Sequence, residues 1–387
     1  MSSNIINTIL LYFAVEVIAV YFMYIANKRR NNKRHFALQT KNISIKISST
    51  LLYIVISFLP LFLLMALKND SVGTDTKSYK AAYEAISHGT LSAQQSAWLG
   101  IGFRSIATIF TFLHIDYHVF FACLSFITLS LFYQTIWKYS KKPALGLFIF
   151  ISTCLFFQTF NQYRQLLAIA LVFFSYNFIA PKRNFPKFLV TIIIAASIHN
   201  SALIFLPIYF ISKINLTNRT FITYIALTIL GHVLYIPLLA LISNTHYGQM
   251  YFGSYLDLSF KTSTILNLLI RLVLLTFCMI PYKKMLKMDN TAKGMYHAVI
   301  ICTIIQTFVV RSYTFGRLTT YFFVFYLALI PNILFYIYKN NVKLLYCTMA
   351  FFVCYELFYY SSSSAVESGY QTYRFYLEKE APKSKTI

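Results

Sequence analysis

Charged residues are scarce in this sequence of 387 residues. They make up 12% of the chain, about half of the roughly 25% that a soluble domain carries. Hydrophobic residues account for 58%, so most side chains cannot face water. The composition therefore excludes an ordinary soluble globular protein and indicates a lipid environment.

Acidic residues are the rarer of the two charge types, with 11 Asp and Glu against 34 Lys and Arg and a formal net charge of +23. The basic residues lie in short clusters between apolar runs, for example at residues 28–30, 141–142 and 283–284. This spacing follows the positive-inside rule of membrane proteins. A nucleic-acid-binding protein would instead carry a contiguous basic face, so we expect no nucleic-acid partner.

Cysteine and the common catalytic motifs are also lacking. The six cysteines fall within apolar runs without a CxxC pair, so we expect packing residues and no disulfide or zinc framework. The sequence contains no DxD, HExxH, Walker or GxSxG motif, which argues against a cytoplasmic enzyme that uses nucleotides. We therefore expect neither a metal site nor a cofactor.

Long apolar runs are what the sequence has in abundance. Several of them approach the roughly 20 residues that a helix needs to cross the hydrocarbon core. Backbone polar groups in lipid must be satisfied within their own segment, so these runs are predicted to be helices. We predict an all-α, polytopic integral membrane protein with about 12 transmembrane helices in a single membrane domain over residues 1–387. The predicted spans are residues 5–27, 44–67, 117–137, 144–161, 165–180, 187–198, 200–212, 221–242, 264–282, 296–311, 318–338 and 343–360.

Two further helices are predicted outside these spans. Residues 98–115 are apolar but are interrupted by glycine and by Arg104, so we expect a re-entrant or interfacial helix there. Aromatic and small apolar residues recur at helical spacing near residues 76–88, which predicts an amphipathic helix in the extracytoplasmic loop 68–97.

The charge distribution orients the predicted spans. With the N-terminus outside, the inner loops hold 21 of the 34 Lys and Arg residues, as the positive-inside rule requires. The loop 68–97 and the tail 361–387 then lie outside the cell membrane. If residues 187–212 formed one long span instead of two, every later loop would change sides.

Five arginines lie at or near membrane depth, where charge is expensive and is retained mainly for function. All five map to the outer half or outer edge of this topology, against the positive-inside trend. Snorkelling or helix pairing explains any one of them about equally well. The whole set favours an outward-facing site for an anion, because a guanidinium matches phosphate oxygens. These residues are Arg104, Arg164, Arg271, Arg311 and Arg317.

Two polar residues near the outer face are candidates for proton transfer. Asp75 follows Gly73 in the outer loop, where capping of the next helix is the simpler interpretation. His199 lies at an outer turn, where a packed polar residue is the simpler interpretation. Either group is chemically able to deprotonate a sugar hydroxyl.

Four short motifs follow one another along the chain. They are Gly73-Thr74-Asp75 with Tyr79, the segment NQYRQLLA at 161–168, the segment SIHNSALI at 197–204, and Gly316-Arg317 leading to Tyr321-Phe322 and Pro331. With these motifs the chain resembles the EpsG/Wzy-type exopolysaccharide (O-antigen or capsule) repeat-unit polymerase family over roughly residues 45–360.

The resemblance implies a metal-independent membrane glycosyltransferase in the bacterial cytoplasmic (inner) membrane. Such a polymerase joins oligosaccharide repeat units carried on undecaprenyl diphosphate at the outer face and releases undecaprenyl diphosphate. The implied partners are the lipid-linked oligosaccharide and the lipid bilayer, and a chain-length regulator is left open.

The candidate roles follow from this chemistry. Negative charge develops on the departing diphosphate and is stabilised by cations aimed at it, while Asp75 or His199 takes the acceptor proton. The expected catalytic residues are Asp75, His199, Arg164 and Arg317. The residues expected to bind the diphosphate or the glycan are Arg311, Arg271, Arg104, Tyr79 and Gln165.

Three other functions remain open at this point. A flippase for the same lipid-linked sugar would be expected to show two related halves, which the sequence does not show. A glycan ligase would favour a larger late outer loop than residues 243–263. A membrane O-acyltransferase would leave the chain length of the polymer intact.

Overall fold

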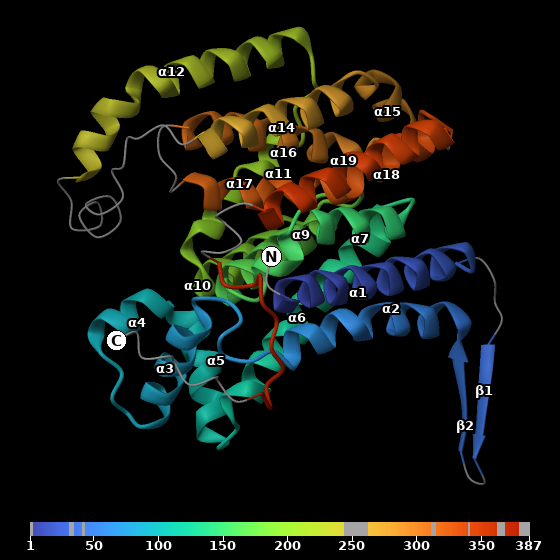
Figure 1. Cartoon of the computed structure of the whole chain (residues 1–387). Coiled ribbons are helices and arrows are strands. Elements are labelled where there is room, and N and C mark those ends of the chain that lie inside the picture. Colours follow the sequence, from blue (N-terminus) through green and yellow to red (C-terminus); the bar gives the residue numbers. More distant parts are fainter. Residues whose placement is uncertain are drawn as a thin grey trace. The chain divides into compact units, whose positions relative to one another are not determined.

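Helices dominate the computed structural model, which describes residues 3–30, 35–40, 43–243, 262–310, 315–339, 341–361 and 368–378 (Figure 1). Among these residues, seven helices are long and apolar enough to cross a membrane. The bent pair α14 (Thr262–Met279) and α15 (Tyr282–Met288) would add an eighth. The predicted all-α polytopic fold class is therefore confirmed.

Several of the predicted spans are shorter helices in the structure. The prediction for residues 144–161 becomes α7 (Pro143–Ser152) and the one-turn helix α8 (Leu155–Gln158), separated at Cys154 by a left-handed backbone conformation. The prediction for 165–180 becomes α9 (Tyr163–Ser175) and a 3₁₀ turn at Tyr176–Phe178. The interval 187–212 divides at His199 as predicted. Its parts are α10 (Phe185–Ile198), a 3₁₀ helix at Asn200–Phe205 and α11 (Ile208–Ile211).

Residue contacts divide the chain into two compact units. The first unit comprises Met1–Ala170, Ser197–His199 and Asn341–Ile387, and the second comprises Leu171–Ala196 and Asn200–Asn340. Whether the membrane part forms the single domain predicted from the sequence stays a prediction.

The first unit is built on packed apolar helices. They are α1 (Ser3–Lys28), α2 (Ser49–Ala66), α6 (Tyr117–Tyr139), α7, α8 and α19 (Val342–Ser361). Helix α1 packs against α2 and α7, α2 against α6, and α7 against α19. The Ser57 hydroxyl donates to the Ala19 carbonyl at 2.6 Å, so a buried polar group on α2 finds its partner on α1.

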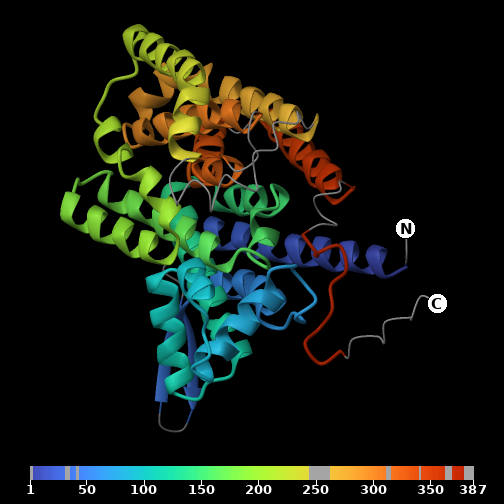
Figure 2. The same cartoon turned by 90° about the vertical axis from the view of Figure 1, so that its left-hand side faces the viewer.

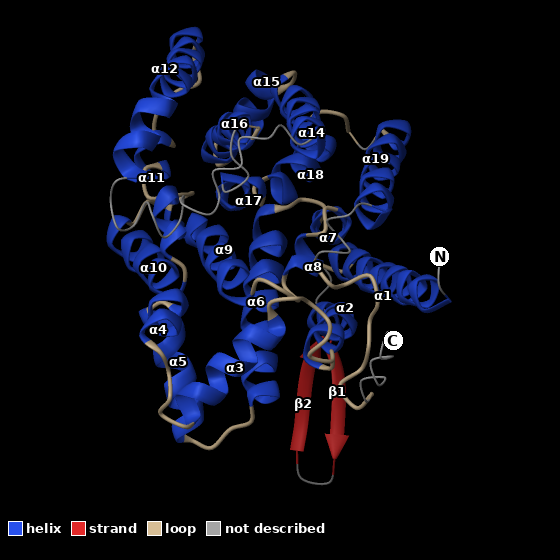
Figure 3. Ribbon diagram, turned by 60° about the vertical axis from the view of Figure 1, so that its left-hand side comes forward, coloured by secondary structure: helices blue, strands red, loops and turns tan. Residues whose placement is uncertain are grey.

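A β-hairpin between α1 and α2 was not predicted. Strands β1 (His35–Thr40) and β2 (Ile43–Ser48) pair antiparallel and extend from the ends of these two helices (Figure 3). The segment 43–48 reads Ile-Ser-Ile-Lys-Ile-Ser, and this strict alternation is the pattern of a strand. The predicted span 44–67 therefore begins later, at Ser49.

Three short helices complete the first unit. They are α3 (Thr76–Ser87), α4 (Ala93–Leu99) and α5 (Ile101–Phe112). Helix α3 buries Tyr79, Ala82 and Tyr83, which confirms the amphipathic helix predicted near residues 76–88. Helices α4 and α5 meet at Gly100, whose φ is +72°. At 12 residues, α5 is only about 18 Å long and too short to cross a bilayer.

The two ends of the first unit differ in character. At one end, the Arg29 guanidinium lies 5.1 Å from the Tyr53 ring centre, and the Asn27 amide donates to the Lys141 carbonyl at 3.5 Å. Basic clusters from separate parts of the sequence therefore share this end. At the other end, residues 368–378 run beside the loop that follows α2 (Figure 2).

Among the described residues, the second unit contains the last five residues of α9, most of α10 and the later helices up to residue 339. These are α11, α12 (Asn218–Ser243), α14, α15, α16 (Ala292–Val309), α17 (Gly316–Phe323) and α18 (Tyr326–Tyr336). Helix α16 packs against α11, α14, α15, α17 and α18. The large rings of Tyr296, Phe325 and Tyr326 are fully buried, so the core of this unit lies around α16 and α18.

Candidate functional site

Arg164 is the residue around which the candidate site in the first unit is built. It lies in the first turn of α9 and is only 7% exposed. Its Nε donates to the Tyr79 phenol oxygen at 3.4 Å, and its Nη1 donates to the Trp98 carbonyl. The guanidinium carbon also lies 4.8 Å from the centre of the Trp98 ring. These partners are all neutral, and none of the ion pairs among the described residues involves Arg164.

Helix α3 presents one face to this guanidinium. The Tyr79 ring is buried, with its centre 4.9 Å from that of Trp98 and 5.6 Å from that of Tyr163. The Tyr79 amide donates to the Asp75 carbonyl at 3.0 Å, so Asp75 lies one turn before Tyr79. Residues four apart share a helix face, and Asp75 is therefore on the side of α3 that carries Tyr79.

Asp75 does not have the capping role that its position suggested. It precedes α3, but its side chain accepts no capping hydrogen bond from that helix. Its backbone amide donates to Asn161 Oδ1 at 2.6 Å. Asn161 is buried and lies three residues before Arg164, so it holds the start of α3 beside the start of α9. The Asp75 side chain is half-buried.

Gly73 makes the close approach of these two segments possible. Its φ is +86°, and a Cβ there would lie 2.5 Å from the Phe160 carbonyl oxygen. The Thr76 hydroxyl donates to that same carbonyl at 3.2 Å. Only glycine fits this turn, because a side chain would meet backbone that other contacts hold in place.

The end of α10 brings His199 into the same unit. A Cβ on Gly100 would lie 3.2 Å from the Ser197 carbonyl oxygen and 3.9 Å from Arg164 Nη1. The chain at Ser197 therefore passes close to the joint between α4 and α5. His199 follows two residues later and is half-buried. From α5, Arg104 donates to the Ser96 hydroxyl of α4, and Gln165 is buried next to Arg164 on α9.

Two of the remaining predicted arginines, Arg271 and Arg317, belong to the second unit. The Arg271 guanidinium stacks 3.6 Å from the centre of the Phe323 ring in the second unit, and its Nε is buried without a hydrogen-bond partner among the described residues. Arg317 is exposed at the start of α17, about 9 Å along the helix from Phe323. Arg311 lies outside the described residues.

A second buried cation, Lys68, was not among the predicted site residues. Its Nζ donates to the Val72 carbonyl and to the Thr76 hydroxyl, both at 2.7 Å. Burial lowers the pKa of Lys68 to about 7, with the Asp70 carboxylate opposing the shift. A lysine just after a span normally snorkels to water, so the sequence alone carried no signal for its burial.

Asp70 is the centre of a neighbouring polar cluster. Lys80 Nζ lies 2.8 Å from Asp70 Oδ2, and the Tyr117 hydroxyl donates to the same oxygen at 2.9 Å. Burial by itself would raise the pKa of Asp70, but the hydrogen bonds from Lys80 and Tyr117 outweigh it and hold the pKa below its usual value. This carboxylate is therefore held by an ion pair to Lys80 of α3 and by a hydrogen bond from Tyr117 of α6.

Two buried glutamates in the predicted spans were also missed. Glu16 on α1 and Glu356 on α19 are both buried, and their carboxyl groups interact. Both carboxyl oxygens of Glu16 have no hydrogen-bond partner among the described residues. An acid inside an apolar run is a recognised sign of function, so the sequence did carry a signal for this pair.

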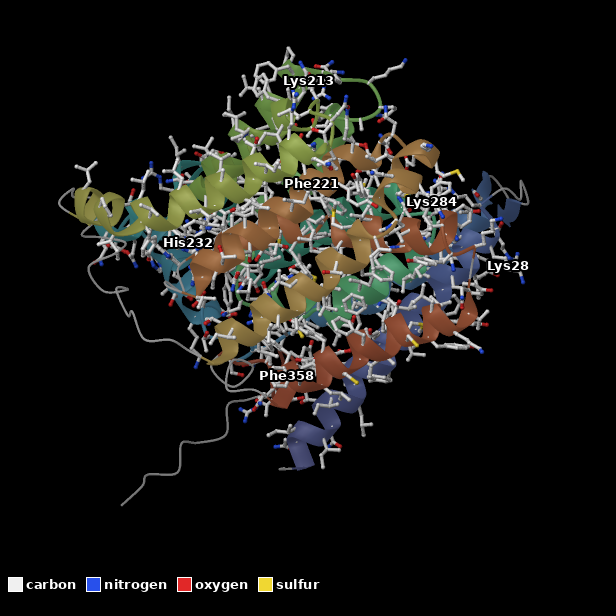
Figure 4. All side chains as sticks on the ribbon, turned by 90° about the horizontal axis from the view of Figure 1, so that it is seen from above. Lys28, Lys213, Phe221, His232, Lys284 and Phe358 are labelled. Carbon is white, nitrogen blue, oxygen red and sulfur yellow. The ribbon has the colours of Figure 1, made fainter. Side chains whose placement is uncertain are left out.

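The second unit contains an apolar groove of about 320 Å³. It lies between α12, α14 and α16, and Phe221, labelled on α12 in Figure 4, is one of its lining residues. Threonine hydroxyls from α12 and α16, such as those of Thr228 and Thr303, are the few polar groups along it.

Comparison with known proteins identifies one family. A family model described as the EpsG family matches residues 51–375, a range that includes Asp75, Arg164, His199 and Arg317. No curated protein and no solved structure matches the chain. The resemblance inferred from the four motifs is thereby confirmed.

Proposed function

Because the chain belongs to the EpsG family, a Wzy-type polymerase-like family, we propose that it polymerises an exopolysaccharide. The substrates in this proposal are oligosaccharide repeat units linked to undecaprenyl diphosphate. The reaction takes place at the outer face of the bacterial cytoplasmic membrane and needs no metal. The EpsG match supports the polymerase class, and the substrates and the reaction are the proposal.

The observation that carries this proposal is the environment of Arg164. A buried charge without a counter-ion costs several kcal/mol, and such residues persist in membrane proteins mainly where function requires them. The guanidinium of Arg164 contacts a phenol, a carbonyl and two aromatic rings. A diphosphate would supply the missing negative charge, with two oxygens that match the guanidinium fork.

The proposed reaction is a displacement at the anomeric carbon of the donor sugar. The acceptor hydroxyl forms the new bond, the bond to the diphosphate oxygen breaks, and its electron pair leaves with undecaprenyl diphosphate. Arg164 stabilises the charge that develops on this leaving group. The proton of the acceptor hydroxyl goes to Asp75, which does not cap its helix and shares a face of α3 with Tyr79.

Other candidate residues keep supporting roles in the proposal. Tyr79 orients the guanidinium through its hydroxyl, and His199 is the alternative base within the same unit. Gln165 and Arg104 are proposed to contact the glycan or the diphosphate from α9 and α5. The proposed contributions of Arg271, Arg311 and Arg317 are separate, because Arg271 and Arg317 belong to the second unit and Arg311 is outside the described residues.

A reconstituted assay tests the proposal directly. The protein in lipid vesicles is supplied with purified lipid-linked repeat units, and the products are separated by length. Loss of one charge-stabilising donor typically lowers kcat by about 10²–10³-fold, so we expect Arg164→Ala to remove polymer. We expect Arg164→Lys to recover little activity, because an ammonium lacks the planar fork.

Arg30→Ala is the matched control. Arg30 lies at the basic end of the first unit, with its guanidinium carbon 4.9 Å from the Trp137 ring, and its loss should leave polymer length normal. Membrane insertion is measured for every variant. Normal polymer from Arg164→Ala would contradict the proposal. Accumulation of single repeat units on the cytoplasmic side in cells carrying that variant would favour a flippase.

A further inference from the structure

A polar groove of about 260 Å³ lies between the start of α1 and the segment 368–378 of the first unit. This groove is lined by Asn4, Asn7, Thr8, Leu11, Thr372, Tyr373, Arg374, Phe375 and Glu378. It takes no part in the contacts of Arg164 described above. Its lining combines amides, hydroxyls, a guanidinium and a carboxylate with two aromatic rings.

The groove residues on α1 recur at helical spacing. Asn4, Asn7, Thr8 and Leu11 are spaced at i, i+3, i+4 and i+7, so they share one face of the helix. Polar residues at the first turns of a membrane helix would ordinarily face water. Asn4 and Asn7 are exposed, whereas Thr8 is buried and its hydroxyl accepts a hydrogen bond from the Tyr373 amide at 2.9 Å, so the segment 368–378 runs beside this face.

The opposite wall is held firmly to the rest of the unit. The Tyr373 hydroxyl donates to the Leu64 carbonyl at 3.0 Å, and the Tyr376 amide donates to the Leu67 carbonyl at 2.8 Å. The Asn69 side chain donates to the Glu378 carbonyl at 3.1 Å. Hydrogen bonds from the backbone and from side chains therefore fix this segment in place on both sides of Arg374.

The groove is joined to the candidate site by a short stretch of backbone. Near its start, the same segment accepts hydrogen bonds from the amides of Gly73 and Thr74, through the carbonyls of Gly369 and Ser368. The next residue in the chain is Asp75. Two backbone hydrogen bonds thus connect the segment that borders the groove to the two residues before Asp75, which is proposed to take the acceptor proton.

The chemistry of the lining selects a hydroxyl-rich ligand. Each asparagine amide offers both donors and an acceptor, Arg374 offers donors, and Glu378 offers acceptors. Sugar hydroxyls use both kinds of group, and the carbon–hydrogen face of a sugar ring packs on aromatic rings such as Tyr373 and Phe375. An apolar lipid tail would leave the amides unsatisfied. A free phosphate would meet the charge of Glu378.

We propose that this groove is a glycan subsite, which holds an uncharged sugar residue of the lipid-linked oligosaccharide away from the bond being formed. Its volume is near the lower end of the roughly 300–1,000 Å³ of small-molecule sites, which suits a single sugar ring. The inference rests on the proposed function, because it takes the substrate to be a glycan. A subsite of this kind would keep hold of the chain between successive additions.

Binding and chain length test the subsite together. The probe is the repeat-unit oligosaccharide cut from the cell's own polymer and freed of lipid, and its binding to the full-length protein in nanodiscs is measured by calorimetry. Two lost hydrogen bonds contribute roughly 2 kcal/mol, so the double variant Asn7→Ala/Glu378→Ala should weaken binding by about 10–30-fold. In the reconstituted assay the same variant should give shorter chains while the first linkage still forms.

Gln94→Ala is the matched control, because Gln94 is an exposed amide on α4 that does not line the groove. It should bind the probe and elongate chains like the unaltered protein. Arg374→Lys keeps the charge and the backbone hydrogen bonds, so it should fold normally. It should weaken oligosaccharide binding less than the double variant does, which separates loss of binding from a folding defect.

The outcomes separate the two proposals. Unchanged binding and chain length in the groove variant, with polymer lost in Arg164→Ala, would overturn the subsite and leave the polymerase intact. Weaker binding in the groove variant, with normal polymer from Arg164→Ala, would keep a glycan site but overturn the polymerase mechanism. Displacement of the oligosaccharide by millimolar inorganic phosphate would also overturn the subsite, because it would identify the groove as an anion site.

Discussion

Two buried cations, Arg164 and Lys68, both donate hydrogen bonds to side chains of α3, and only Arg164 was predicted from the sequence. Arg164 belongs to a recognisable motif at membrane depth, where an isolated charged residue indicates a functional site. Lys68 follows a span, where basic residues are commonplace. Its burial depends on the hydrogen bonds of its ammonium group to Val72 and Thr76. No local sequence pattern predicts this arrangement.

The lowered pKa of Lys68 predicts a pH-dependent stability. Below about pH 7 the lysine is protonated in both the folded and the unfolded protein, so the folded state bears the full cost of burying the charge. Between the folded pKa of about 7 and the ordinary value of 10.5, only the unfolded protein binds the proton. Stability should therefore rise with pH by up to about 1.4 kcal/mol per unit.

Thermal unfolding of the protein and of Lys68→Met in detergent, at pH 7 and at pH 9, measures this effect. The unfolding midpoint of the unaltered protein, relative to that of the variant, should be higher at pH 9 than at pH 7. A constant difference between the two proteins would show that Lys68 does not titrate in this range.

Among the elements, α3 shows how much of the site follows from local pattern. Its amphipathic spacing predicted the helix, whereas the capping role suggested for Asp75 is absent. The hairpin β1–β2 could also have been predicted from local pattern, because apolar and polar residues alternate at residues 43–48. The break between α7 and α8 could not be predicted in this way. The residue with a left-handed conformation there is Cys154, whereas glycine usually occupies such a position.

Two glycines bracket α3 and provide a matched pair for mutation. Both have positive φ, but a Cβ at Gly73 meets the Phe160 carbonyl whereas a Cβ at Gly89 meets nothing within 4 Å. Gly89→Ala should cost only the backbone strain of about 1–2 kcal/mol. Gly73→Ala adds steric overlap, for a total of about 2–5 kcal/mol, and should also displace Asp75.

Thermal unfolding and polymer synthesis of the two variants check this expectation. Gly89→Ala should remain active with a slightly lower midpoint, and Gly73→Ala should lose polymer as well as stability. Equal effects of the two substitutions would mean that contact with Phe160 does not hold the site.

For the whole molecule, the family and the fold class could be predicted from the sequence, but the grouping of the arginines could not. The five arginines look alike as isolated charges in apolar surroundings. Only long-range contacts assign Arg104 and Arg164 to one unit and Arg271 and Arg317 to the other. His199 likewise joins Arg164 through Ser197 and Gly100, which are about 100 residues apart in the sequence.

The contrast between the two ends of the first unit predicts its orientation in the membrane. The end with Lys28 and Arg29, labelled at Lys28 in Figure 4, should face the cytoplasm, and the end with α3 and α4 should face outward. In a variant without native cysteines, a membrane-impermeant maleimide should label Gln94→Cys on intact cells. Lys28→Cys should react only after permeabilisation.

The reverse labelling would place Arg164 and Asp75 on the cytoplasmic side. A reaction at the outer face would then be impossible, and the proposed function would fail whatever the activity of the individual arginine variants.

The hydrogen bond from the Asn69 amide to the Arg374 carbonyl joins residues that are synthesised far apart in time. Ribosomes add about 5–20 residues per second, so about 15–60 s separate the synthesis of these two partners at that rate. The early helices can enter the bilayer during that interval, but the turn before Asp75 lacks its partners Ser368 and Gly369 until translation is almost over. Incomplete chains would therefore insert before this turn has its hydrogen-bond partners.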